Sequence, residues 1–226
     1  MTAPSSERPI GRALTRRGFV LGAALLASGC TARTIELAFH APDPADYGPL
    51  PDEKFPVPAV PPGAVNPMYM RRIVAYETTE KPGTIIVDPE NKFLYLTMPN
   101  GQAMRYGVGV GREGFAWNGV AVIRHKAEWP TWTPPSEMID RQPELAKYRT
   151  GMPGGIKNPL GARALYLYQG GRDTLYRLHG TNEPRSIGHN VSSGCVRLIN
   201  QDIIDLYARV PLGTRVVVLG KEGAAA

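Results

Sequence analysis

Residues 174–210 read TLYRLHGTNEPRSIGHNVSSGCVRLINQDIIDLYARV, and this stretch predicts a strand, a loop and a helix in that order. The strand is expected over 174–178, where β-branched, aromatic and aliphatic residues follow one another. The helix is expected to begin at Asn200, whose side chain can cap it, and to run to about Val210, just before Pro211. Its apolar residues recur at helical spacing, so one face should pack against a sheet.

The rest of the chain is divided into short strands by turn residues. The other strands are predicted at 84–87, 93–98, 104–110, 120–125, 164–168 and 214–219, and a second short helix at 143–149. With 22 Pro and 25 Gly in 226 residues, the composition argues against a helix-rich architecture. We therefore expect a mostly β fold with minor α content: a mixed-sheet β-sandwich or open barrel with one main helix.

Residues 1–29 have the features of an export signal. Arg12, Arg16 and Arg17 precede an apolar run at 19–27, which is shorter than the roughly 20 residues that span a bilayer. The pattern Thr15-Arg16-Arg17-Gly18-Phe19-Val20-Leu21 resembles a twin-arginine signal. This signal predicts a periplasmic or cell-envelope location.

The signal ends in Leu26-Ala27-Ser28-Gly29-Cys30, which resembles a lipoprotein processing site at Cys30. Ordinary cleavage nearby is the alternative, and an anchor at Cys30 would be the only link to a membrane. Four Arg and one Glu lie in residues 1–29, so the net charge of +6 falls by 3 to +3 for the remainder. A net charge of +3 does not indicate a nucleic-acid-binding protein. Unless Cys30 and Cys195 form a disulfide, Cys195 is a lone thiol in an oxidising compartment.

Residues 30–68 are expected to form a Pro-rich segment, since nine prolines lie between 40 and 67. Such a segment can be a semi-rigid tether, or an arm wrapped over the domain through Tyr47, Phe55 and Val57. The globular domain is expected at 69–220, followed by a tail at 221–226.

The chemistry is concentrated at His179 and Cys195. A thiol attacks an amide as its thiolate, and a histidine within hydrogen-bond reach can take the proton and later deliver it to the leaving amine. Gly194 adds no side chain beside the sulfur, so the backbone N–H groups of residues 194 and 195 could face a developing oxyanion.

The segments 179–182 (HGTN) and 192–198 (SSGCVRL), with fifteen residues between His179 and Cys195, resemble the L,D-transpeptidase family. Residues 158–165 (NPLGARAL) and 188–191 (GHNV) also resemble it, and the likeness covers roughly 70–220. The resemblance implies that Cys195 is the nucleophile and His179 the base.

The same resemblance implies further site residues. It makes the Gly180 carbonyl the group that orients the imidazole, and Arg197 a binder of substrate carboxylates. An ion pair of Arg197 with Asp202 or Asp205 is the structural alternative. The remaining candidates for contacts with the substrate or with the catalytic residues are Asn182, Ser192 and Ser193. Many relatives have His at the position of Ser193. His189 is a second histidine that could lie next to the thiol.

The implied reaction is acyl transfer on peptidoglycan stem tetrapeptides. Cys195 would attack the carbonyl of the third residue, expel D-alanine and form a thioester that an amine resolves. The amine could belong to another stem or to an outer-membrane protein. No metal or other cofactor is implied. The alternatives are an L,D-carboxypeptidase or hydrolase with the same Cys–His site, and a noncatalytic wall-binding lipoprotein, against which the intact pair argues.

Three tryptophans admit two interpretations. Trp117, Trp129 and Trp132 could form one wall of a substrate groove, since flat rings pack on glycan and peptide, or they could belong to the core.

Overall fold

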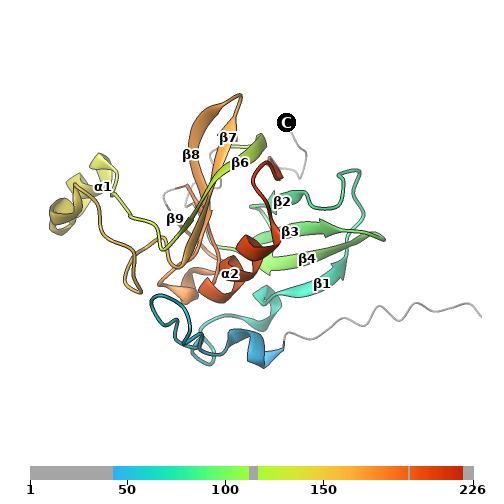
Figure 1. Ribbon diagram of the computed structural model, residues 1–226, viewed down its shortest axis with the longest axis horizontal. Coiled ribbons are helices and arrows are strands. Elements are labelled where there is room, and N and C mark those ends of the chain that lie inside the picture. The colour runs from blue at the N-terminus through green and yellow to red at the C-terminus, as the bar shows by residue number, and fades with distance from the viewer. Residues whose placement is uncertain (1–42, 112–116, 193, 221–226) are drawn as a thin grey trace, which may run out of the picture. The chain divides into compact units, whose positions relative to one another are not determined.

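The computed structural model describes residues 43–111, 117–192 and 194–220 (Figure 1). The expected export signal, Cys30, the expected tail at 221–226 and Ser193 lie outside these residues. Within them, no helix is long and apolar enough to cross a membrane.

A mixed nine-stranded sheet forms the body of the described chain, in the order β1-β4-β3-β2-β11-β6-β7-β8-β10. Its strands are β1 (Arg72–Ala75), β2 (Ile85–Asp88), β3 (Phe93–Met98), β4 (Gln102–Gly107), β6 (Gly119–Glu128), β7 (Arg163–Gln169), β8 (Arg172–His179), β10 (Val196–Arg197) and β11 (Arg215–Val218). The strands β5 (Val110–Gly111) and β9 (Asn190–Ser192) pair separately. Most neighbours are antiparallel, while β11–β2 and β10–β8 are parallel. The expectation of a mostly β, mixed-sheet fold is confirmed.

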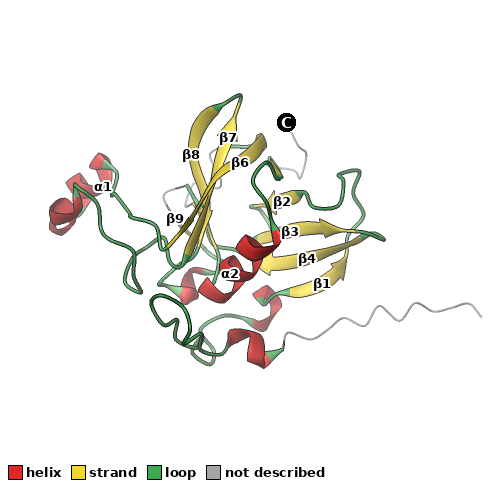
Figure 2. Cartoon of the chain, viewed as in Figure 1, coloured by secondary structure: helices red, strands yellow, loops and turns green. Residues whose placement is uncertain are grey.

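Helices are few and short (Figure 2). The α-helices are α1 (Ser136–Arg141) and α2 (Asn200–Arg209), and the 3-10 helices are η1 (Pro44–Tyr47), η2 (Pro67–Tyr69), η3 (Pro143–Tyr148) and η4 (Pro184–Ser186). The main helix, α2, follows Cys195 as predicted. The short helix predicted at 143–149 is the 3-10 helix η3, and α1 was not predicted.

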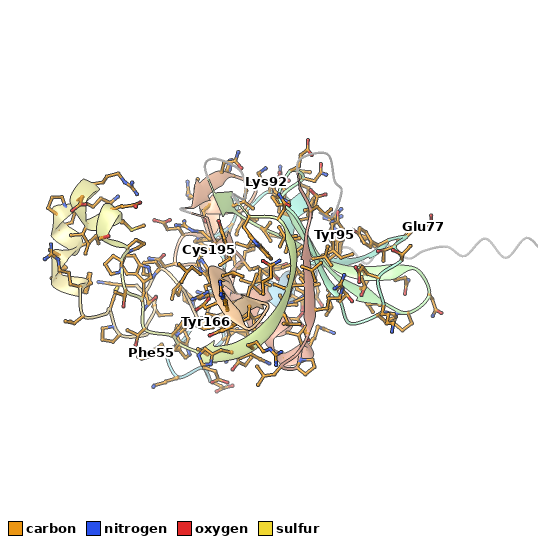
Figure 3. All side chains as sticks on the ribbon, turned by 90° about the horizontal axis from the view of Figure 1, so that it is seen from above. Phe55, Glu77, Lys92, Tyr95, Tyr166 and Cys195 are labelled. Carbon is orange, nitrogen blue, oxygen red and sulfur yellow. The ribbon has the colours of Figure 1, made fainter. Side chains whose placement is uncertain are left out.

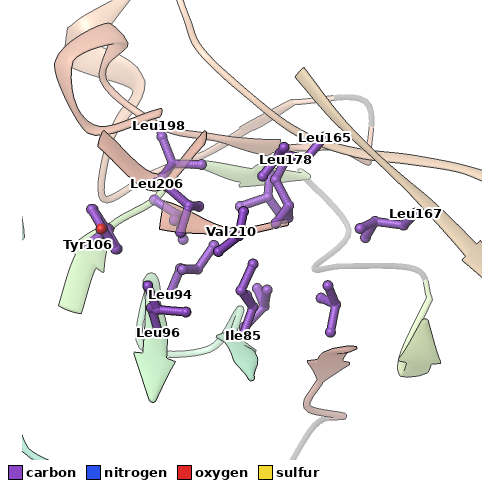
Figure 4. Packing of buried hydrophobic residues seen from close by; sticks show 14 of the residues in the cluster. Ile85, Leu94, Leu96, Tyr106, Leu165, Leu167, Leu178, Leu198, Leu206 and Val210 are labelled. Carbon is purple, nitrogen blue, oxygen red and sulfur yellow. The ribbon is translucent and has the colours of Figure 1, made fainter. Parts of the chain in front are cut away.

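The core lies between α2 and the two halves of the curved sheet (Figures 1 and 4). Leu94 of β3, Leu165 of β7 and Leu206 of α2 are fully buried in one cluster, which Ile85 and Val210 join. Both halves of the sheet therefore depend on the apolar face of α2, which the sequence periodicity had predicted.

The predicted role of Asn200 as a helix cap is wrong. Ile199 is the N-cap residue and makes no side-chain cap bond. The Asn200 side chain instead points across to the loop before β7, where its Oδ1 accepts the Ala162 N–H at 2.9 Å. A cap needs a polar side chain just before the first helical residue, and here the helix starts one residue too early for Asn200 to serve.

Residues 43–68 pack against the domain and are not an extended spacer. Tyr47, Val57 and Val65 expose only 5%, 2% and 4% of their surface. We call this segment the arm. Apolar burial supplies the free energy that holds it in place.

Polar contacts fix the position of the arm. Glu53 forms a two-pronged ion pair with Arg163 of β7, at 2.6 and 2.9 Å, and accepts the Trp129 indole N–H at 3.0 Å. Gln201 of α2 donates to two arm carbonyls at 3.0 Å each. The arm is thus joined to both the sheet and the helix.

A buried carboxylate lies under the arm. Asp202 of α2 is 0% exposed and accepts the Tyr47 hydroxyl at 3.0 Å, with the Arg71 guanidinium 3.6 Å away. Burial raises the pKa of Asp202 to about 7, while Arg71 and the Tyr47 hydroxyl hold it down. The Tyr47 hydroxyl therefore stabilises the charged form of this carboxylate.

We predict that Tyr47→Phe lowers the free energy of unfolding by about 1–3 kcal/mol, because a buried charged acceptor loses its donor. An unfolded aspartate titrates near pH ~3.9. Between that value and its folded pKa the folded protein binds more protons than the unfolded chain, so the contribution of Asp202 falls as the pH rises. Losing the hydroxyl raises the folded pKa further, so urea titrations should show a larger deficit at pH 8 than at pH 5.

The matched control is Tyr148→Phe on η3, whose hydroxyl has no hydrogen bond to any described residue. It should leave the unfolding free energy unchanged at both pH values. Equal losses in the two variants would show that the Asp202 contact contributes nothing.

Candidate active site

The predicted catalytic residues lie at the β7–β8–β10 edge of the sheet. The register pairs Ala164 with His179 and His179 with Arg197, so these three form a row across the strands. Cys195 immediately precedes β10, two residues before Arg197 of that row, and its place in the molecule is marked in Figure 3. Parallel pairing of β8 and β10 thus places the cysteine segment beside the strand that ends in His179.

The geometry of His179 determines which ring nitrogen carries the proton. Its Nδ1 lies 2.6 Å from the Gly180 carbonyl oxygen. Because a carbonyl only accepts, Nδ1 must donate, and Nε2 is left as the acceptor. The side chain is 4% exposed, and burial lowers its pKa to about 4, so the ring is neutral near pH 7.

Close packing against α2 holds the backbone of His179-Gly180-Thr181, the HGT segment. A Cβ at Gly180 would lie 2.3 Å from Asn200 Oδ1 and 3.0 Å from the Ala162 N, so no side chain fits. Thr181 is 3% exposed, and its hydroxyl accepts the Glu183 N–H at 3.0 Å. Helix α2 therefore positions the carbonyl that in turn orients His179.

Cys195 is half-buried, and its Sγ lies 3.9 Å from the Leu175 carbonyl oxygen. Burial raises the pKa of the thiol, which a hydrogen bond from the Arg177 backbone and the charges of Arg177 and Arg197 partly offset. The resting pair of groups is thus a neutral thiol and a neutral imidazole.

Beside the thiol, Gly194 has φ +129, a conformation that L side chains rarely adopt. A Cβ there would be 3.2 Å from the Tyr176 ring, on which Trp117 stacks at 5.8 Å. Of the three tryptophans, only Trp117 approaches the thiol's surroundings. Trp129 is buried against Phe55 of the arm, and Trp132 pairs with Met152.

Arg197 forms its ion pair with Glu183, at 2.8 Å. The expected alternative of Asp202 or Asp205 is wrong, because Asp202 lies under the arm and Asp205 binds Arg209. The Glu183 side chain is 64% exposed, so this pair is open to solvent on one side.

The other predicted substrate contacts are spread around the site. Asn182 is exposed and donates to the Lys157 carbonyl at 3.2 Å, while Ser192 ends β9 and is paired with Gly111. His189 is exposed, and its carbonyl accepts the Val110 N–H. Ser193 is outside the described residues.

A pocket of about 510 Å³ lies between the arm and the loop that follows the HGT segment. Its lining combines Pro61 and Ala64 of the arm with Asn182, Glu183 and Val191. The docked arm therefore forms part of the surface next to the Arg197–Glu183 pair, which the sequence did not reveal.

Sequence reasoning also missed Tyr176, Arg177 and Glu183. Alternation along β8 could have indicated Arg177, since residues two apart on a strand face the same side and His179 is two residues on. Among the described residues, no group of three His, Cys, Asp or Glu side chains could hold a metal ion.

Residues 82–218 match the model of the YkuD family, the L,D-transpeptidase catalytic domain. The chain is 37% identical over 142 residues to the probable L,D-transpeptidase ErfK/SrfK of Escherichia coli (strain K12), covering 60% of this chain and 43% of that protein. It is also 37% identical over 143 residues to the probable L,D-transpeptidase YbiS of the same strain, covering 59% and 43%. The match thus spans less than half the length of these relatives.

A solved structure from Brucella melitensis, described as a probable carnitine operon oxidoreductase caia, is 49% identical, with a TM-score of 0.48 over 69% of this chain and 97% of that one. The family model covers more than half of this chain and includes both His179 and Cys195. The chain therefore belongs to the L,D-transpeptidase catalytic-domain family.

Proposed function

We propose that this protein cross-links peptidoglycan as an L,D-transpeptidase, with Cys195 as nucleophile and His179 as general base. The family acts on peptidoglycan and is a class of cysteine-dependent acyltransferases. The observation that carries the assignment to these residues is the 2.6 Å contact between His179 Nδ1 and the Gly180 carbonyl. That contact leaves Nε2 without a proton, as a base requires.

In the first half-reaction, the Cys195 thiol gives its proton to His179 Nε2 as the sulfur attacks the carbonyl carbon of the third stem residue. The oxyanion would accept hydrogen bonds from the backbone N–H groups of Gly194 and Cys195. When the intermediate collapses, the peptide bond to D-alanine breaks, and the leaving amine takes the proton from His179. A thioester on Cys195 remains.

In the second half-reaction, an amine attacks the thioester carbonyl and gives a proton to His179. The thiolate then leaves and recovers that proton. The amine would belong to a second stem or to an outer-membrane protein, and water in its place would make the enzyme an L,D-carboxypeptidase.

The substrate's carboxylates would meet Arg197, whose Glu183 partner is exposed enough to be displaced. Asn182, Ser192 and Ser193 are proposed as secondary substrate contacts. We place the protein in the periplasm or cell envelope, exported by the signal at 1–29 and anchored through Cys30 if that residue is lipidated.

One test of the proposed function concerns the products. Purified protein incubated with diaminopimelate-containing disaccharide tetrapeptide should release D-alanine and form cross-linked dimers, seen by mass spectrometry, and Cys195→Ala should give neither, because the thioester cannot form.

Cys195→Ala should retain the circular dichroism spectrum of the parent. D-alanine release without dimers would instead favour the carboxypeptidase or a protein acceptor. Dimers that persist in Cys195→Ala would contradict the assigned nucleophile.

Another test concerns pH. Burial raises the pKa of Cys195 and lowers that of His179 to about 4. Both groups should therefore be neutral at pH values between these two pKa values. Only the thiolate reacts with iodoacetamide, so the alkylation rate should rise by about tenfold per pH unit from pH 6 to 8.

Labelling of Cys195 at each pH, followed by intact-protein mass spectrometry, measures this rate. A rate that is flat from pH 5 to 8 would mean that a thiolate–imidazolium pair already exists at pH 5, contrary to the neutral pair.

A further inference from the structure

Strand β8 contains a large β-bulge next to Cys195. The register pairs Tyr166 with Arg177 and Tyr168 with Asp173, so a single residue of β7 faces the three residues 174–176 of β8. A regular antiparallel pair sets one residue against one, so β8 carries two extra residues here. Such bulges re-aim the groups of a strand.

An ion pair closes the base of this bulge. Arg177 donates from Nη1 to Asp173 Oδ1 at 2.7 Å and from Nη2 to Asp173 Oδ2 at 2.8 Å. Residues four apart on a regular strand are separated by about 13 Å, whereas the bulge reduces this to roughly the spacing of residues two apart. The Arg177 guanidinium also lies over the Tyr166 ring, 4.4 Å from its centroid, which fixes its plane. We call the Asp173–Arg177 pair the clamp.

Inside the clamp the backbone is held in an unusual conformation. Leu175 has φ +64, which is uncommon for a residue with a side chain, although that side chain is 75% exposed and fills no core space. Asp173 Oδ1 accepts the Leu175 N–H at 2.8 Å, and the Thr174 hydroxyl donates to the Leu167 carbonyl at 2.7 Å. Strain of this kind persists only where neighbouring contacts enforce it.

The strained backbone faces the sulfur. The Leu175 carbonyl oxygen is 3.9 Å from Cys195 Sγ, and β10 runs parallel to β8 with Val196 opposite Leu178, which places Cys195 beside Arg177. The clamp's two charges act on the thiol in opposite directions, since Arg177 lowers its pKa and Asp173 raises it.

We propose that the Asp173–Arg177 clamp is a positioning device for Cys195, holding the bulge of β8 against the sulfur and balancing the charge beside it. The inference rests on Cys195 being the nucleophile of the proposed function. Asp173 and Arg177 are positioning residues, because they act through the thiol and need not touch the substrate.

Two substitutions test the electrostatic part, because they must act in opposite directions. Arg177→Gln removes the positive charge and should raise the thiol pKa, whereas Asp173→Asn leaves Arg177 unbalanced and should lower it. The expected shifts are roughly 0.5–1 pH unit each, reduced by the partial exposure of both side chains. Iodoacetamide labelling of Cys195 across pH 6–10 measures the pKa in the full chain. Shifts in the same direction, or no shifts, would overturn the proposal.

Arg177→Lys separates charge from geometry. It keeps the positive charge but cannot form the two-pronged contact. It should keep the thiol pKa within about 0.3 pH unit of the parent and lower the kcat for D-alanine release by about tenfold, since a misplaced nucleophile costs rate. An unchanged kcat would show that the clamp does not position Cys195.

Arg215→Gln is the matched control, because it also breaks a two-pronged ion pair, with Glu80 at 2.9 and 3.0 Å, on the surface at β11. It should change neither the thiol pKa nor kcat, and thermal unfolding of every variant reports its folding. Alkylation needs no stem peptide, so opposite pKa shifts in a protein that fails to process the stem would support the clamp and overturn the proposed substrate.

Discussion

The site depends on the parallel pairing of β10 with β8. That pairing spans only Val196 with Leu178 and Arg197 with His179, yet it places the cysteine segment beside the histidine strand. Further backbone hydrogen bonds support the pairing. The N–H of Leu198 donates to the His179 carbonyl at 2.8 Å, and Arg197 and Gly109 each donate their N–H to the carbonyl of the other. A parallel pair needs a long crossover, and the loop after the HGT segment supplies it.

Helix α2 links this pairing to the arm. Its first turn presents Asn200 toward the backbone at Ala162 and Gly180, and Asp202 toward the arm residue Tyr47. The same turn therefore sets the carbonyl that orients His179 and holds the segment that lines the neighbouring pocket. The two contacts come from one turn of one helix, so a shift of the helix would disturb both.

The parts of this structure that sequence could predict are local. Hairpins follow from turn residues between alternating strands, and α2 follows from its helical period. The HGT and SSGC segments indicated His179 and Cys195 before any geometry was known. Contacts such as Glu53 with Arg163 could not be predicted, since they join residues 110 apart without any periodic pattern. Asp173 and Arg177 are close in sequence, but a regular strand would hold them apart. The local sequence contains no signal of the bulge that brings them together.

The electrostatics of the site explain how the Cys195 side chain is kept as a protonated thiol. Thiolates are the species that oxidants, metals and electrophiles attack, and burial of Cys195 disfavours the thiolate. The imidazole is likewise kept neutral by burial, but its Nε2 remains ready to accept a proton. In the proposed mechanism, charge separation would therefore be required only while the sulfur forms its bond to carbon, when backbone N–H groups would stabilise the new oxyanion. Under the proposed function, a site arranged in this way would limit side reactions of the thiol and keep it available for acyl transfer.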